Sequence, residues 1–259
     1  MHRDKQKQNN TSRLVLFDID QTLITHGGAT RKAMYRALQE TLPIDLTRPE
    51  ISNIRMSGKT DPQIVREFIF ASNIEQSGKE ESYWQKIINQ TLEFYLKFLP
   101  EEIDEVAKTP KYFMHDGVVE ILQLLDHDER IALGLLTGNV EKGARIKLER
   151  FNLNRFFPIG AYGCDSANRL DLPAIAHKRA EEHYSLSLTP TQIIIIGDAE
   201  NDVLCAKHYG AISLAVNTGT TTRQELCSLE PDYLFSSLKD TSRILDAIMS
   251  QSVAGGIIL

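Results

Sequence analysis

Three short runs of apolar residues constrain the fold most, because each is followed at once by a small polar or acidic residue. They cover residues 14–17 before Asp18, 131–136 before Thr137, and 193–196 before Gly197 and Asp198. Apolar runs of this length without alternation are typical of strands covered on both faces, as in a parallel sheet flanked by helices. Two further runs, 211–216 and 233–235, are predicted to extend the same sheet.

From about residue 116 onward, amphipathic helical patterns alternate with these strands. Val118, Ile121, Leu122 and Leu125, for example, share one face of a helix. Strand and helix in alternation predict right-handed βαβ units in an α/β, doubly wound, Rossmann-like parallel sheet. Ligands of such sheets bind beyond the carboxyl ends of the strands, where the three polar positions described above are expected to meet.

The stretch from 25 to 115 differs, because it holds helical patterns at 33–41, 62–72 and 81–99 with few strand-like runs. We therefore predict a helical cap domain at 25–115, inserted into a catalytic core of residues 13–24 and 116–245. Residues 1–12 are predicted to be a flexible tail, and residues 246–259 a C-terminal tail.

Composition narrows the class of protein. The 259 residues carry a formal net charge of −6, which gives no general attraction to nucleic acid or anionic membranes. No apolar run approaches the roughly 18 residues needed to span a bilayer. Cys164, Cys205 and Cys227 lack metal-site or redox spacing, so we expect reduced thiols in a cytoplasmic protein of unknown oligomeric state.

Four acidic residues follow two of the predicted strands. Asp18 and Asp20 are two positions apart, so that in a turn one carboxylate could attack a substrate while the other delivers a proton; a pair of turn aspartates is the alternative. Asp198 and Asp202 lie at a predicted helix start, where acids are often only caps. Carboxylates converging at one edge would repel unless a cation neutralised them, and an all-oxygen set favours Mg²⁺ over zinc.

The apolar run 131–136 is followed by Thr137, Gly138 and Asn139. A hydroxyl beside a glycine lets backbone amides approach a phosphoryl group closely, although a simple turn explains the triplet equally well.

Together these residues resemble the haloacid dehalogenase superfamily of phosphohydrolases, in the phosphoglycolate phosphatase-like group with a helical cap. The shared pattern is a DxDxT segment, a Ser or Thr after a second strand, a basic residue and a GDxxxD segment. The resemblance implies that Asp18 is the nucleophile, Asp20 the general acid and base, and Thr137 a phosphoryl ligand. It also implies that Asp198, Asp18 and the backbone carbonyl of Asp20 hold Mg²⁺, with Asp202 acting directly or through water.

The basic residue has two candidates, because the family's common KPxP segment is absent. Arg169 is preferred because it lies just before the helix predicted from Asp171, whereas Lys178 falls inside that helix. Basic residues of the preceding helix are interpreted as solvated: Lys142, Arg145, Lys147 and Arg150.

A cap loop with Gly58 and Lys59 is predicted either to contact the substrate or to form a plain turn. The sequence thus predicts a Mg²⁺-dependent phosphatase that hydrolyses a small phosphorylated metabolite through an aspartyl phosphate. A sugar phosphomutase of the same fold and a non-enzymatic metabolite-binding regulator are the alternatives. Asp20 disfavours a dehalogenase, because a halide leaving group needs no proton.

Overall fold

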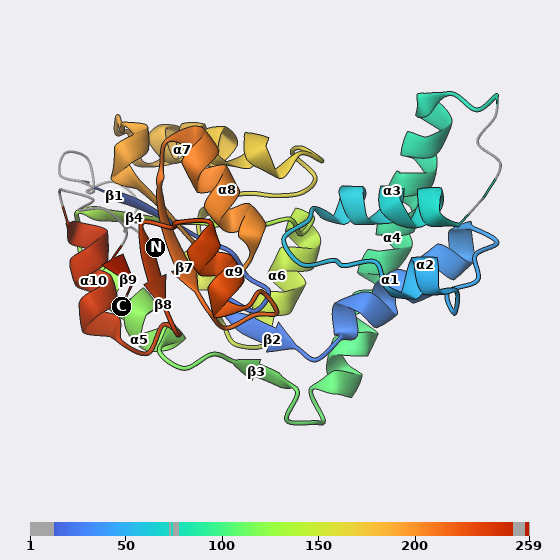
Figure 1. Cartoon of the computed structure of the whole chain (residues 1–259), viewed down its shortest axis with the longest axis horizontal. Coiled ribbons are helices and arrows are strands. Elements are labelled where there is room, and N and C mark those ends of the chain that lie inside the picture. The colour runs from blue at the N-terminus through green and yellow to red at the C-terminus, as the bar shows by residue number, and fades with distance from the viewer. Residues whose placement is uncertain (1–12, 73, 75–77, 251–256, 259) are drawn as a thin grey trace.

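The computed structural model describes residues 13–72, 74, 78–250 and 257–258. The predicted flexible tail, residues 1–12, lies outside the described residues. The chain forms a sheet covered by helices on both faces and, beside one edge of that sheet, a separate group of helices formed by α1 to α4 (Figure 1).

The sheet has seven parallel strands in the order β5-β4-β1-β6-β7-β8-β9. Their bounds are β1 (Arg13–Phe17), β4 (Ile131–Leu136), β5 (Ile159–Ala161), β6 (Ile193–Gly197), β7 (Ile212–Val216), β8 (Tyr233–Phe235) and β9 (Ile257–Ile258). Every residue of β1, β4, β6 and β7 is buried, which explains why these strands are continuous apolar runs. The predicted doubly wound α/β class is confirmed.

Alternate residues of β1 serve two different hydrophobic clusters. Val15 and Phe17 pack in a cluster with α5 (Val118–His127), α6 (Glu141–Glu149) and α10 (Thr241–Met249). Leu14 and Leu16 pack with α7 (Leu172–Tyr184) and α8 (Glu200–Tyr209). Successive side chains of a strand point to opposite faces, so β1 is held between two helical layers and its carboxyl end is rigidly placed.

The inserted helices are α1 (Ala29–Thr41), α2 (Pro49–Ser52), α3 (Asp61–Ala71) and α4 (Glu81–Val106). They bury an apolar cluster of their own, in which α1 packs along α4. An antiparallel ribbon of β2 (Ile24–His26) and β3 (Tyr112–Met114) joins this group to the sheet. The sequence does not predict this ribbon, because three-residue strands are too short to show a period. We call residues 25–115 the cap, and its bounds as a domain stay a prediction.

The C-terminal boundary differs from the predicted one at residue 245. Helix α10 continues to Met249, because Ile244, Ala247 and Ile248 are all buried against the core. Residues 257 and 258, also assigned to the predicted tail, pair with β8 as β9. None of the described helices combines the length and apolar character needed to cross a membrane. All three cysteines are free thiols.

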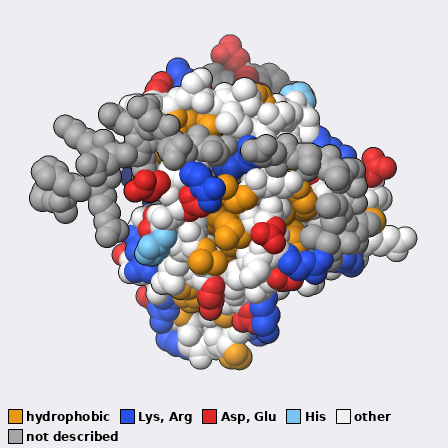
Figure 2. All heavy atoms as spheres, turned by 90° about the vertical axis from the view of Figure 1, so that its left-hand side faces the viewer, with side chains coloured by type: hydrophobic (Ala, Val, Ile, Leu, Met, Phe, Trp, Pro, Cys, Tyr) orange, Lys and Arg blue, Asp and Glu red, His pale blue; other side chains and the backbone are white. Residues whose placement is uncertain are grey.

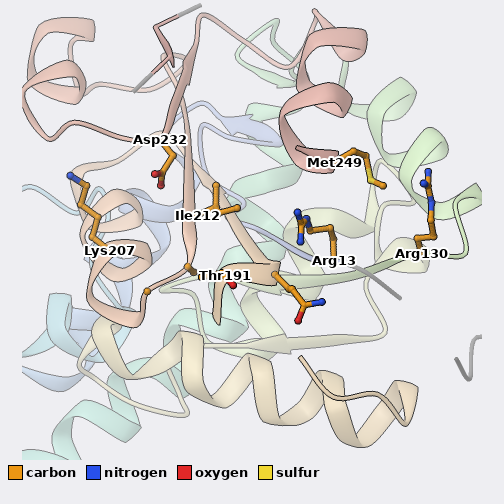
Figure 3. A pocket seen from close by; sticks show the side chains of 10 residues that line it. Arg13, Arg130, Thr191, Lys207, Ile212, Asp232 and Met249 are labelled. Carbon is orange, nitrogen blue, oxygen red and sulfur yellow. The ribbon is translucent and has the colours of Figure 1, made fainter. Parts of the chain in front are cut away.

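A cavity of about 970 Å³ lies at the amino-terminal edge of the sheet, away from the cap. Its lining includes Arg13, Arg130 and Asp232, each at or just before the start of a strand (Figure 3). Arg13 donates to the Ile248 carbonyl at 3.0 Å, and the other two are also hydrogen-bonded. Figure 2 views this end of the molecule, where acidic and basic side chains are interspersed around hydrophobic ones.

Candidate active site

Three polar residues predicted to meet at one sheet edge do so. Asp18, Thr137 and Asp198 directly follow β1, β4 and β6, and these strands are neighbours in the order β4-β1-β6. Strands β4 and β5 extend the sheet on one side of β1, and β6 to β9 extend it on the other. The strand order therefore reverses at β1, which is the switch point where doubly wound sheets bind ligands. This edge faces the cap (Figure 1).

A tight turn after β1 aims the two carboxylates. The Leu23 amide donates to the Ile19 carbonyl at 2.9 Å, while Gln21 takes a left-handed conformation with φ of 67°. Ile19 and Leu23 are fully buried and anchor the turn in the core. Thr22 then donates its hydroxyl to Asp198 at 3.1 Å, so the turn is linked directly to the end of β6.

Three of the predicted metal ligands form one buried group. Asp18, Asp198 and Asp202 each offer a carboxylate oxygen, and these oxygens lie within 4.8 Å of one another. Burial, opposed by Arg169 and reinforced by the neighbouring carboxylates, raises the pKa of Asp18 to about 7. Burial and the charges of Asp202 and Asp18 raise the pKa of Asp198 well above its ordinary value. Without a cation the group is therefore electrostatically costly.

This carboxylate group fits a hard divalent cation. The Oδ2 atom of Asp198 is buried and has no hydrogen-bond partner among the described residues. A buried carboxylate oxygen in that state needs a ligand or a cation, and an all-oxygen set suits Mg²⁺. The side chain of Asp20 is not part of the group, which is compatible with the backbone carbonyl role that the family resemblance implies for it.

Arg169 lies against the nucleophile candidate. Its Nη2 atom donates to Asp18 Oδ1 at 3.0 Å and also to Asp202 Oδ1. The residue begins the short 3₁₀ helix η2 (Arg169–Asp171), which leads into α7. Lys178, the second candidate, is not brought to the site. Its side chain is 78% exposed and faces Glu182, because position 178 falls on the solvent side of α7.

Asp20 lies in a separate charged cluster. Lys147 Nζ donates to Asp20 Oδ1 at 2.9 Å and Oδ2 at 2.7 Å, and Asn139 Nδ2 donates to Oδ2 at 2.9 Å. His26 Nε2 is 3.4 Å from Oδ1. Burial alone would raise the pKa of Asp20, but Lys147, His26 and the hydrogen bonds lower it to about 2.

The interpretation of Lys147 as a solvated helix residue is wrong. Its side chain is 0% exposed, and it occupies the buried face of α6 together with Ala144 and Leu148. Helical spacing could have revealed it. Lys147 is three residues after Ala144 and one before Leu148, which both face the core, so it falls on the same apolar face of the helix. The lysine is buried because the Asp20 carboxylate and the Asn139 carbonyl satisfy its ammonium group.

Residues after β4 hold the cap against the core. Thr137 is fully buried, and its hydroxyl accepts from Asn139 Nδ2 at 2.8 Å. At Gly138 an added Cβ atom would lie only 2.0 Å from the Lys59 carbonyl oxygen. Glycine is therefore required for the cap loop to approach the core this closely.

The predicted cap loop lies over the site. The Gly58 carbonyl accepts from Asn201 at 2.8 Å and from Arg169 at 3.4 Å, and the Asp61 amide donates to the Gly138 carbonyl at 2.7 Å. Gly58 thus contacts the core through its backbone. The ammonium group of Lys59 is paired within the cap, with Glu67 at 2.5 Å.

The family model of the haloacid dehalogenase-like hydrolases matches residues 15–216. The chain belongs to this family. Its match spans the strands that carry the acidic residues and the inserted cap between them. The predicted resemblance and the predicted class, a haloacid dehalogenase-like phosphatase, are thereby confirmed.

Relatives of this haloacid dehalogenase-like hydrolase include a phosphoglycolate phosphatase of Mannheimia succiniciproducens, 24% identical over 92% of this chain and 100% of that protein. The pyrophosphatase PpaX of Anoxybacillus flavithermus is 25% identical over 56% of this chain and 71% of its own length. Among solved structures, a predicted phosphatase from Clostridium acetobutylicum has a TM-score of 0.66 at 20% identity, covering 92% of this chain and 100% of that one. A predicted phosphoglycolate phosphatase from Haemophilus somnus has a TM-score of 0.65 at 18% identity, covering 91% and 98%.

Proposed function

We propose that this hydrolase is a Mg²⁺-dependent phosphatase that cleaves a small-molecule phosphomonoester through an aspartyl phosphate on Asp18. The observation that carries the proposal is the position of the Asp18 carboxylate at the end of β1, beside Arg169 and the acids Asp198 and Asp202. The phosphoglycolate phosphatase and pyrophosphatase relatives support phosphoryl chemistry.

In the first step, a carboxylate oxygen of Asp18 attacks phosphorus while the ester oxygen departs. The guanidinium of Arg169, already bonded to Asp18, stabilises negative charge on the phosphoryl group. Thr137, which directly follows the neighbouring strand β4, binds a phosphoryl oxygen in this proposal. Asp198, Asp18, Asp202 and the Asp20 backbone carbonyl would hold Mg²⁺, which when bound supplies positive charge against the phosphoryl oxygens.

Asp20 acts as general acid in the first step and as general base in the second. As the P–O bond breaks, its carboxyl group protonates the leaving oxygen; it then accepts a proton from the water that hydrolyses the aspartyl phosphate. The low pKa of Asp20 keeps the carboxylate ionised for the second step. A bound phosphoryl dianion raises the pKa of a nearby acid, which favours the protonated form needed in the first step.

The test is phosphate release by the purified chain from a panel of phosphorylated metabolites, with 2-phosphoglycolate and pyrophosphate included. Each compound is assayed with Mg²⁺ and with a chelator. We expect release from at least one ester with Mg²⁺ and none in chelator. Full activity in chelator would overturn the metal assignment.

The same panel separates the alternatives. A phosphomutase would isomerise a sugar phosphate without net phosphate release. A non-enzymatic binding protein would bind a phosphorylated compound in calorimetry but turn over none of the panel, including generic aryl phosphates.

A further inference from the structure

Lys147 is more completely enclosed than any other charged group around the site, since none of its side chain is exposed. Its three ammonium protons match three acceptors: both oxygens of Asp20, at 2.9 and 2.7 Å, and Asn139 Oδ1 at 2.5 Å. A charged ammonium group can be buried this deeply only if each of its protons has a hydrogen-bond acceptor. The three acceptors therefore fix the position of the Lys147 ammonium group.

The network around Lys147 closes on itself. Asn139 donates from Nδ2 to Asp20 Oδ2 at 2.9 Å and to the Thr137 hydroxyl at 2.8 Å, while its carbonyl oxygen accepts from Lys147. The backbone at Lys147 is held as well, because its carbonyl accepts from the Tyr112 hydroxyl at 2.7 Å. The lysine therefore links the end of β4, the turn after β1 and the cap ribbon.

Asp20 needs such a link. It lies on a turn and its side chain is 28% exposed, so packing alone does not fix the rotation of its carboxylate. One ammonium bonded to both carboxylate oxygens, with an amide bonded to one of them, fixes the plane of that group. Arg169 does not position Asp20. Its described hydrogen bonds go to Asp18, Asp202 and the Gly58 carbonyl, and none goes to Asp20.

We propose that Lys147 is a positioning residue that holds the Asp20 carboxyl group at the leaving oxygen, so that its importance grows with the leaving group's need for a proton. The inference rests on the proposed function, in which Asp20 gives its proton to the departing oxygen as the Asp18–phosphorus bond forms. A proton must be within hydrogen-bond reach to be transferred in the transition state.

The experiment compares two aryl phosphates of nearly equal size, 4-nitrophenyl and 4-methylphenyl phosphate. The phenol released from the first is acidic and departs without a proton. The phenol released from the second is weakly acidic and needs a proton to depart. The quantity is kcat/KM, which reports the steps up to aspartyl phosphate formation and leaves out its hydrolysis. The variants are Lys147→Met and the milder Lys147→Gln, which keeps a donor; the control is Lys142→Met, an exposed lysine of the same helix.

For Lys147→Met we expect kcat/KM to fall at least about tenfold on 4-methylphenyl phosphate and less than about threefold on 4-nitrophenyl phosphate, since positioned acids contribute factors of about 10² to 10⁴. Lys147→Gln should recover part of the loss on the methylphenyl ester alone, and Lys142→Met should match wild type. If Lys147 were merely structural, each variant would lower kcat/KM equally on both esters, and that result would overturn the inference. If Lys147→Met does not fold, Lys147→Gln decides by the same ratio. A wild-type chain that releases phosphate from neither ester would overturn the proposed function, and this inference with it.

Discussion

Two clusters of buried charge flank the turn after β1, and they treat neighbouring carboxylates in opposite ways. Around Asp18, burial and the charges of Asp202 and Asp20 outweigh Arg169, and the pKa rises to about 7. Around Asp20, a lysine, a histidine and an amide outweigh burial, and the pKa falls to about 2. The comparison shows that the surroundings, and not the position along the chain, separate the proposed nucleophile, which needs a cation, from a carboxylate that Lys147 already neutralises.

The largest effect should come from Asp18→Asn. The amide keeps the shape but is no nucleophile, so phosphate release should fall by at least about 10³-fold, a barrier increase of about 4 kcal/mol. Asp126→Asn, on the exposed side of α5, is the matched control and should keep wild-type turnover. Residual activity within about tenfold of wild type would remove Asp18 from the nucleophile role.

Arg169→Gln tests whether Arg169 and Lys147 act on different parts of the reaction. It removes a donor from Asp18 and from the phosphoryl group, so kcat/KM should fall about 10²- to 10³-fold, the usual cost of losing such a donor. Because the loss concerns phosphorus and not the departing oxygen, it should be the same on 4-nitrophenyl and 4-methylphenyl phosphate. A loss confined to the methylphenyl ester would mean that Arg169 and Lys147 serve the same step.

Stability should separate the clusters by sign. Because the pKa of Asp18 is raised from 3.8 to about 7, the metal-free protein loses stability as pH rises from about 4 to about 7. The lowered pKa of Asp20 gives stability that is present above about pH 4 and is lost as pH falls toward 2.

At pH 8 in chelator, Asp18→Asn should therefore raise the free energy of unfolding by up to about 4 kcal/mol, and Asp20→Asn should lower it by about 2 kcal/mol. Urea denaturation measures both. Added Mg²⁺ should stabilise wild type more than Asp18→Asn, because the variant has lost a ligand charge. Changes of the same sign in the two variants would show that the clusters are not electrostatically opposed.

Gly138→Ala tests whether both clusters depend on the closed cap. The added methyl group would meet the Lys59 carbonyl at 2.0 Å and push the cap loop from the core. We expect kcat/KM to fall about tenfold on both aryl esters, since closure positions the groups around the substrate. Gly143→Ala is the matched control, because neither Gly138 nor Gly143 has a positive φ and an added Cβ at Gly143 would meet nothing closer than 3.5 Å. Wild-type kinetics in Gly138→Ala would mean that closure is not required.

Lys59→Ala should have the smallest effect. The sequence predicts that Lys59 either contacts the substrate or lies in a plain turn. Its ammonium group is paired with Glu67, and a partly exposed pair of this kind contributes less than about 1 kcal/mol. We expect KM for an anionic substrate to change less than about threefold. A rise of tenfold or more would show that the lysine leaves Glu67 for the substrate.

The sheet and its acidic edge were predictable because each cause is local in sequence. Apolar runs fix the buried strands, and parallel strands bring the residues that follow them together, so Asp18, Thr137 and Asp198 could be placed without coordinates. The partners of each carboxylate could not. The rotation of each helix against the sheet decides whether Arg169 or Lys178 reaches Asp18 and whether Lys147 turns inward to Asp20. The order of strands and helices along the chain does not determine that rotation.

The position of β1 inside the sheet, between β4 and β6, has a consequence for folding during synthesis. Its pairing partners in β4 and β6 lie about 120 and about 180 residues further along the chain, so its neighbours are joined to it only by closing long loops. During synthesis the amino-terminal end emerges first, and this strand, apolar from Leu14 to Phe17, has no partner until the strand after the cap has been made. The acidic cluster is completed later still, when Asp202 has left the ribosome. A nascent chain that stops short of that residue carries the nucleophile without its site, together with an unpaired strand that favours aggregation.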